Sequence, residues 1–283
     1  MEEKLEMGKN STKNLIMFNQ LFKPKKTMIG MIHLPALPGY PKHTGMDDVI
    51  QKALSDLNTL QKAGFDGILV ENDNDQPHQI GVSKTISNAF TKVMEQICRN
   101  ATIPVGMEII YDMLETIRVA HKVRADFVRL DVFVDSVETE WGKITAQPKE
   151  IVELKKKLGA DNLVLLTDIQ VKHAKMLQEK TIAASTQEAI ENGSDALIVT
   201  GDWTGHAPSI SDCKSINNFA SNFPLLIGSG FNIYNSKALL QYADGAIVGT
   251  SIKTGEYVDF TKAKKLINSV RNLKRNDNRF NIR

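Results

Sequence analysis

Two short turns near the end of the chain combine glycine with hydroxyl side chains. Gly228-Ser229-Gly230 and Gly249-Thr250-Ser251 each close a short apolar run, about twenty residues apart. Glycine lets a backbone approach a ligand closely, and N–H groups at the start of a helix favour an anion. The two turns therefore predict a shared phosphate cradle with hydroxyl donors, to which Lys253 would add charge. The alternative is a pair of ordinary strand-to-helix turns, where glycine and serine are common anyway.

A second group of polar side chains follows the other apolar runs. Carboxylates that are crowded together repel one another, so they need a cation, an arginine or a proton to coexist. Arg129 is one candidate partner, a divalent cation held by Glu71, Glu108 and Asp168 is another, and a carboxyl held protonated as a general acid is a third. In chain order the group comprises His33, Glu71, Asn72, Asp73, Glu108, Arg129, Asp131, Asp168, Lys172, His173, Thr200 and Asp202, with Gly201 between the last two.

Simpler roles compete with this interpretation. Aspartate is a frequent N-cap in the loops before helices, which is enough to explain Asp73 and Asp202. That role suits Glu71, Glu108 and Asp168 less well, because they lie at or next to an apolar run. For His33, a structural role and a catalytic role both remain open.

The apolar runs that precede these residues alternate with segments of helical period, and each pair forms one strand-helix unit. Several strands are introduced by a similar phrase, in which glycine or alanine ends a helix and aspartate precedes the strand: AGFDG, VRADF, NGSDA and YADGA. The expected strands are 28–34, 67–71, 104–109, 126–130, 163–167, 196–200, 224–227 and 245–248. The expected helices are 46–63, 84–99, 112–123, 148–158, 185–192, 211–220, 233–242 and 261–273.

Eight such units predict an α/β fold with a single closed (β/α)₈ TIM barrel. An open doubly wound sheet is the rival, but no Gly-x-Gly-x-x-Gly follows the first strand. The polar residues on the strands would then meet at one end of the barrel, and the loops after its last two strands often hold phosphate. We expect residues 1–26 to be an N-terminal extension, with a short apolar helix at 15–22 under the barrel floor, and residues 27–283 to form the barrel domain.

Composition excludes several other classes of function. The net charge of +2 gives no nucleic-acid footprint, and no apolar run approaches the roughly 20 residues that a membrane span needs. The N-terminus shows no secretory signal, and the two cysteines, Cys98 and Cys213, match no metal or disulfide spacing. We expect a cytoplasmic protein that binds a small phosphorylated ligand, with no nucleic-acid partner and no membrane span, and with a homo-oligomer left open.

Six motifs, in this order, resemble the BtpA/SgcQ family. They are MIGMIHLPALPGYP (28–41), ILVENDNDQP (68–77), LTDIQVKHA (166–174), IVTGDWTG (198–205), LLIGSGFN (225–232) and DGAIVGTSIK (244–253). The resemblance runs from about residue 20 to the C-terminus and implies a barrel similar to the ribulose-phosphate-binding barrels. One branch of the family is tied to the accumulation of photosystem I proteins at a membrane-peripheral location, and another is encoded among sugar-uptake and sugar-metabolism genes.

The resemblance places His33, Glu71, Asn72, Asp168, Lys172, His173, Gly201 and Gly205 on family positions, together with both phosphate turns. Glu108 and Asp131 depart from the small or amide residues usual there, so the ring of carboxylates is in part particular to this chain.

Two candidate functions follow. One is an isomerase, epimerase or lyase acting by acid–base chemistry on a phosphorylated sugar, with no certain cofactor beyond a possible divalent cation. The other is a non-catalytic assembly factor.

In the enzyme, Glu71 or Asp168 would be the acid or base and His33 or His173 the proton partner. Lys172 would stabilise an oxyanion, and residues 170–184 would form a lid.

Overall fold

The computed structural model describes residues 17–22, 26–171, 174–203 and 205–273. Within them, parallel strands close into a barrel in the order β1-β11-β10-β9-β7-β4-β3-β2. The predicted (β/α)₈ barrel is thereby confirmed. The barrel strands are β1 (Thr27–His33), β2 (Gly67–Glu71), β3 (Val105–Glu108), β4 (Phe127–Leu130), β7 (Val164–Ile169), β9 (Ala196–Val199), β10 (Leu225–Ile227) and β11 (Gly245–Val248).

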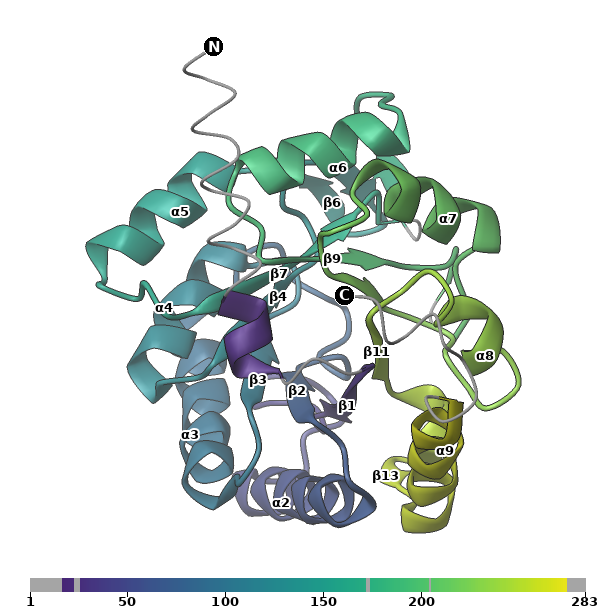
Figure 1. The fold of residues 1–283 in the computed structure, drawn as a ribbon. Helices are drawn as coiled ribbons and strands as arrows, with labels where there is room; N and C mark the ends of the chain where they lie inside the picture. The colour runs from purple at the N-terminus through teal and green to yellow at the C-terminus, as the bar shows by residue number, and fades with distance from the viewer. Residues whose placement is uncertain (1–16, 23–25, 172–173, 204, 274–283) are drawn as a thin grey trace.

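Helices surround the strands in a ring (Figure 1). Each has an apolar stripe that faces the sheet; in α3, for example, Phe90, Val93, Met94 and Ile97 are all buried. The helices are α2 (Met46–Ala63), α3 (Lys84–Asn100), α4 (Met113–Val123), α5 (Pro148–Lys157), α6 (Ile182–Glu191), α7 (Ile210–Phe219), α8 (Ser236–Leu239) and α9 (Phe260–Leu273), with a 3₁₀ turn η1 (Thr250–Ile252) after β11.

Helix α8 is much shorter than the span of 233–242 predicted from the sequence. Asn232 Oδ1 accepts hydrogen bonds from the N–H groups of Tyr234 and Asn235, and Asn235 Oδ1 accepts one from the N–H of Asn232. These side-chain bonds fold residues 232–235 into a turn that competes with the helix. The helix therefore begins only at Ser236.

The aspartate in each of the four repeated phrases links neighbouring strands at the floor of the barrel. Its carboxylate accepts a hydrogen bond from a backbone N–H near the start of the preceding strand in the barrel. The four bonds run from Met28 to Asp66, from Val105 to Asp126, from Leu165 to Asp195 and from Leu225 to Asp244, at 2.8, 2.8, 2.8 and 3.1 Å. The repeated phrase in the sequence is thus a device that ties neighbouring strands together.

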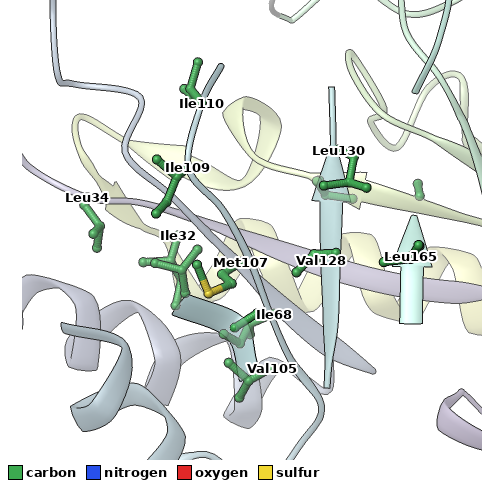
Figure 2. Close-up of a cluster of buried hydrophobic side chains, with 14 of the residues drawn as sticks. Ile32, Leu34, Ile68, Val105, Met107, Ile109, Ile110, Val128, Leu130 and Leu165 are labelled. Carbon is green, nitrogen blue, oxygen red and sulfur yellow. The ribbon is translucent and has the colours of Figure 1, made fainter. Parts of the chain in front are cut away.

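Side chains alternate between the inside and the outside of the barrel, as the pleat of a strand requires. Figure 2 shows part of the outer set, including Ile32, Ile68 and Val128, which fills the space between strands and helices. The inner set forms a separate buried cluster of Ile29, Met31, Leu69, Phe127, Val164, Leu166, Ala196, Ile198, Leu226 and Ile247.

A short helical turn before β1 packs under the floor of the barrel, and residues 15 and 16 of the predicted helix lie outside the described residues. Residues 17–21 are helical, and Phe18 and Phe22 belong to the inner cluster. The ring of Phe22 lies edge-on to Phe127, with ring centroids 5.5 Å apart. In Figure 1 this turn is the purple helix in front of the strands.

An antiparallel sheet beside the barrel mouth was not predicted. It has the order β6-β5-β8 and comprises β5 (Val137–Thr139), β6 (Gly142–Ile144) and β8 (Lys175–Met176). Thr139 Oγ1 accepts a hydrogen bond from the N–H of Trp141 and donates one to the carbonyl of Gly142, which closes the β5–β6 hairpin. The strands are too short for alternation to reveal them in the sequence. A second hairpin joins β12 (Lys253–Thr254) to β13 (Tyr257–Val258).

Candidate active site at the mouth of the barrel

A polar layer lies directly above the apolar inner cluster. The inner positions of each strand recur every two residues, so His33 follows Met31, Glu71 follows Leu69, and Arg129 follows Phe127. The strand register confirms that these residues lie at the same height in the barrel, because His33 pairs with Glu71 and Glu71 pairs with Glu108 across three neighbouring strands. By the same alternation, six further positions face the inside of the barrel: Glu108, Asp131, Asp168, Thr200, Gly228 and Gly249.

This layer forms the base of a cavity of about 680 Å³ at the carboxyl ends of the strands. Three kinds of residue line it. The acidic part comprises Glu71, Asp73, Glu108, Asp131 and Glu140; the glycine turns contribute Gly201, Gly205, Gly228, Ser229, Gly230, Gly249, Thr250 and Ser251; and the aromatic wall consists of His78, Tyr111, Trp141 and Trp203. His33, Arg129 and Thr200 lie between these groups.

Arg129 is the centre of the acidic part. Its Nε and Nη2 donate to the two carboxylate oxygens of Asp168 at 3.0 and 2.8 Å. Its Nη1 lies 3.4 Å from Glu108 Oε2 and 3.6 Å from Glu71 Oε2. The arginine is therefore the partner that lets three crowded carboxyl groups coexist, and the two-pronged bond fixes its orientation through Asp168.

The carboxyl groups around Arg129 are also inclined to keep a proton. Burial raises the pKa of Glu71 to about 7, with Asp73 adding to the rise and Arg129 opposing it. Burial likewise raises the pKa of Glu108 well above its ordinary value, and a hydrogen bond links the two glutamate side chains. For Asp131, burial and the nearby Asp168 raise the pKa to about 6. Glu71 and Glu108 thus form a pair that shares a proton near neutral pH.

His33 is neutral at pH 7. Burial lowers its pKa well below the ordinary value, and the charges of Lys253, Lys52 and Arg129 lower it further. Its Nδ1 lies 3.5 Å from Asp73 Oδ2, but this contact does not outweigh burial and three cations. A neutral imidazole can both accept and donate a proton, so His33 is suited to proton transfer.

The residues of the glycine turns hold neighbouring loops together. Ser229 Oγ donates to the carbonyl of His206 at 2.7 Å and accepts from the N–H of Gly201 at 2.8 Å. Ser251 Oγ donates to the carbonyl of Phe231. Both serine hydroxyls predicted as phosphate donors therefore already donate to backbone carbonyls.

The packing of neighbouring loops also requires glycine at several positions in these turns. A Cβ on Gly201 would lie 2.2 Å from the carbonyl oxygen of His206, and one on Gly230 would lie 2.1 Å from the N of Ala207. A Cβ on Gly228 would meet Ile198 at 2.5 Å. These glycines are needed so that the loops after β9 and β10 can pack against each other, and that packing shapes one wall of the cavity.

Two hydroxyls of this wall differ from the serines. Thr200 Oγ1 is buried and has no hydrogen-bond partner among the described residues. Thr250 is exposed at the start of η1 and lines the cavity. A buried polar atom without a partner is costly, so the Thr200 hydroxyl is suited to meet a polar ligand group. The Thr250 hydroxyl is open to the cavity and can contact the same group.

Four of the described residues singled out in the sequence are not part of the cavity lining: Asn72, Asp168, Asp202 and Lys253. Asn72 is buried beside it, where its side chain donates to Asp75 and accepts from the N–H of Ile110, so its role in the described structure is to join loops. Asp202 is exposed on the loop after β9 and outside the lining. Lys172 and His173 lie outside the described residues.

The loop predicted as a lid is anchored where it is described. Gln170 N–H donates to Asp135 Oδ2, and Gln170 Nε2 donates to the carbonyl of Lys180. Lys180 Nζ donates to the carbonyl of Val134 at 2.9 Å. Strand β8 within this loop also pairs with β5.

The aromatic wall was missed by sequence reasoning. His78 stands edge-on to Tyr111 and to Trp141, with ring centroids 5.7 and 6.1 Å apart. The backbone of Tyr111 has a φ of 60°, a value rare for a residue other than glycine. Together with Trp203, these residues come from four separate loops, so no local motif joins them. The available signal was the pair of tryptophans in otherwise polar loops.

The described residues contain no group of three or more histidine, cysteine, aspartate or glutamate side chains arranged to hold a metal ion. The three carboxyl groups named as candidate metal ligands, Glu71, Glu108 and Asp168, all contact Arg129. A membrane span is likewise not found, because none of the described helices combines the necessary length with enough apolar residues.

Comparison with known proteins gives concordant results. An uncharacterised protein of Pyrococcus horikoshii is 35% identical over 256 residues, which cover 88% of this chain and 97% of that protein. The photosystem I biogenesis protein BtpA of Synechocystis sp. is 31% identical over 238 residues, covering 83% of each chain.

A solved structure shares the fold. (S)-3-O-geranylgeranylglyceryl phosphate synthase from Thermoplasma acidophilum, in complex with sn-glycerol-1-phosphate, superposes with a TM-score of 0.61 at 16% identity, over 91% of this chain and 98% of that one. The sequence model of the BtpA family matches residues 24–272. The chain therefore belongs to the BtpA family.

Proposed function

We propose that this protein is an enzyme that moves protons on a phosphorylated sugar or a related small phosphate ester, in an isomerase, epimerase or lyase reaction. The observation that carries the proposal is the Glu71–Glu108 pair at the base of an open cavity. A general acid or base works best with a pKa near the operating pH, and the pKa of Glu71 is raised to about 7.

The ionised member of the pair would take a proton from a C–H group next to a carbonyl of the substrate. The electrons of the C–H bond would form a carbon–carbon double bond, the π electrons of the carbonyl would move to its oxygen, and the protonated partner or His33 would deliver a proton to that oxygen. Arg129 would stabilise the negative charge that develops on this oxygen. Asp168 has both oxygens engaged by Arg129, so we propose that it positions the arginine and does not itself transfer protons.

The phosphate would bind against the glycine turns, on the wall opposite the acidic part of the cavity. Backbone N–H groups of residues 229, 230 and 249–251 and the hydroxyls of Thr200 and Thr250 would contact it, whereas the N–H of Gly228 already donates to the carbonyl of Val199. This placement is supported by the barrel fold, whose last two βα loops often bind phosphate, and by a neighbour of the same fold solved with sn-glycerol-1-phosphate. Lys172 and His173 keep their proposed roles as oxyanion stabiliser and proton partner, and we also propose a cytoplasmic location.

A non-catalytic role in assembly is the second candidate, because one relative is named a photosystem I biogenesis protein. An assembly factor would dock a partner on its surface. It would have no need for buried carboxyl groups whose oxygens lack hydrogen-bond partners, as Glu71 Oε2 and Glu108 Oε2 do among the described residues. The cavity therefore favours the enzyme.

Two measurements test the proposal. In a thermal-shift panel, phosphate esters are compared with the same compounds lacking phosphate, with and without Mg²⁺. A ligand at about 100 times its Kd should add roughly 2.7 kcal/mol of stability, which is a shift of several degrees. Esters that stabilise the protein are then incubated with it in D₂O, and NMR follows deuterium uptake at carbon. We expect uptake with the wild type and its loss in Glu71→Gln. Stabilisation without any uptake or turnover would refute the enzymatic part of the proposal.

A further inference from the structure

The charges that line the cavity do not suit a ligand that is only anionic. Five carboxyl side chains face the space, whereas Arg129 is the one lysine or arginine among the described lining residues. The two histidines add no charge near pH 7, because burial lowers the pKa of both His33 and His78. A phosphate ester would bring up to two more negative charges into a site that is already negative.

The negative charge of the inner carboxyl groups is offset within the protein. Glu71 and Glu108 share a proton and both approach Arg129. The outer three, Asp73, Asp131 and Glu140, form no ion pair with a lysine or arginine among the described residues, and of these Asp73 and Glu140 are open to solvent. Arg129 and two backbone hydrogen bonds offset the burial of Asp131 only in part, because its pKa remains raised. These three groups therefore keep the outer part of the cavity negative.

The aromatic wall stands beside these outer carboxyl groups. Asp131 and Glu140 both help to raise the pKa of Tyr111, after burial, so the tyrosine ring lies in their negative field. His78 is packed between Tyr111 and Trp141, and Trp203, with 65% of its surface exposed, lines the same cavity from the loop after β9. Aromatic faces next to carboxylates attract a cation by both the ring quadrupole and direct charge.

The size of the cavity leaves room for both groups at once. Ligand cavities of about 300–1,000 Å³ bind molecules of drug size, and this one measures about 680 Å³. A ligand can therefore reach from the glycine turns across the acidic part to the aromatic wall.

We propose that the ligand carries a cationic nitrogen as well as its phosphate, as an amino sugar phosphate or another amine-bearing phosphate ester does. The ammonium group would lie next to the carboxyl groups of Asp131 and Glu140, on the cavity side of the aromatic wall, and the phosphate would lie at the glycine turns. This inference rests on the proposed function, and it narrows the substrate class at the same site.

The test compares matched esters. Glucosamine 6-phosphate is compared with glucose 6-phosphate, phosphoethanolamine with glycerol 1-phosphate, and inorganic phosphate serves as the reference. The chain has two tryptophans, Trp141 and Trp203, and both line the cavity, so intrinsic fluorescence reports its occupancy directly. We expect at least one amine to bind about tenfold more tightly than its neutral counterpart at pH 7.

Variants locate the effect. Glu140→Gln should reduce the preference for the amine at least threefold. Glu138→Gln removes a carboxyl from an exposed position of the same hairpin, outside the cavity lining, and should leave the preference unchanged. If no amine binds more tightly than its neutral partner, the inference is overturned while the proposed function stands. If none of the esters and no inorganic phosphate binds, both are overturned.

Discussion

Replacing Glu71 with glutamine should make the stability of the protein less dependent on pH. In the folded protein the pKa of Glu71 is raised to about 7 by burial, from an ordinary value of 4.5. A carboxyl with a raised pKa favours the folded state fully below pH 4.5, and this contribution is lost as the pH rises through 7. Glutamine is neutral at every pH and removes that loss.

The magnitude follows from the size of the pKa change. A rise in pKa from 4.5 to about 7 changes the free energy of unfolding by about 3 kcal/mol, since a difference of one pKa unit corresponds to about 1.36 kcal/mol. This is an upper limit, because Glu108 shares the proton and takes over part of the effect in the variant. With about 2 kcal/mol remaining, the Tm of Glu71→Gln relative to wild type should rise by roughly 4–8 °C between pH 5 and pH 8.

The assay is thermal unfolding of both proteins at half-unit intervals of pH, followed by circular dichroism. Glu138→Gln, exposed on β5, serves as the matched control and should follow the wild type throughout. A difference in Tm between Glu71→Gln and wild type that stayed constant from pH 5 to pH 8 would refute the raised pKa, and with it the acid–base role of the pair.

Other substitutions test other parts of the structure. Arg129→Met leaves Asp168, Glu71 and Glu108 without their partner and should cost about 3–5 kcal/mol at pH 8, with part of the loss recovered at pH 5; no recovery would argue against carboxylate repulsion as the cause. Gly230→Ala should destabilise more than Gly255→Ala, because both have positive φ but a Cβ meets Ala207 only at Gly230; equal changes in Tm would contradict the close loop packing. Phe22→Ala should cost about 3–5 kcal/mol in urea unfolding if the helical turn closes the floor, and a change below about 1 kcal/mol would show that it does not.

Much of the fold could be predicted because its signals are local. The strand at 67–71 and the helix at 46–63 are found where the sequence places them, since their apolar periods and flanking glycines leave one interpretation. The aspartate before each strand was recognised as a boundary marker. Its second role, accepting a hydrogen bond from the preceding strand, depends on which strands are neighbours and emerges only from the closed barrel.

The part of the candidate site that follows from the alternation of inward and outward positions along the strands could be predicted. His33, Glu71 and Glu108 lie at strand ends and were expected to meet, and they do. The aromatic wall was not expected, because Tyr111 and Trp141 reach it through a turn and a hairpin that the sequence does not announce. From the sequence, the glycine turns were explained only by the binding of a ligand. In the structure, the absence of Cβ atoms in these turns also leaves space for neighbouring residues of the protein.

The most direct test of the central claim is the binding of a phosphate ester at the glycine turns. Tryptophan fluorescence is titrated with glucosamine 6-phosphate and with inorganic phosphate, in wild type, in Thr250→Glu and in Thr261→Glu. Thr250 is exposed and lines the cavity, whereas Thr261 is exposed on α9 and does not, so the two variants add the same charge at different places. We predict saturable binding that Thr250→Glu weakens at least tenfold and Thr261→Glu leaves unchanged. Equal binding by all three proteins, or no binding by the wild type, would contradict the phosphate site.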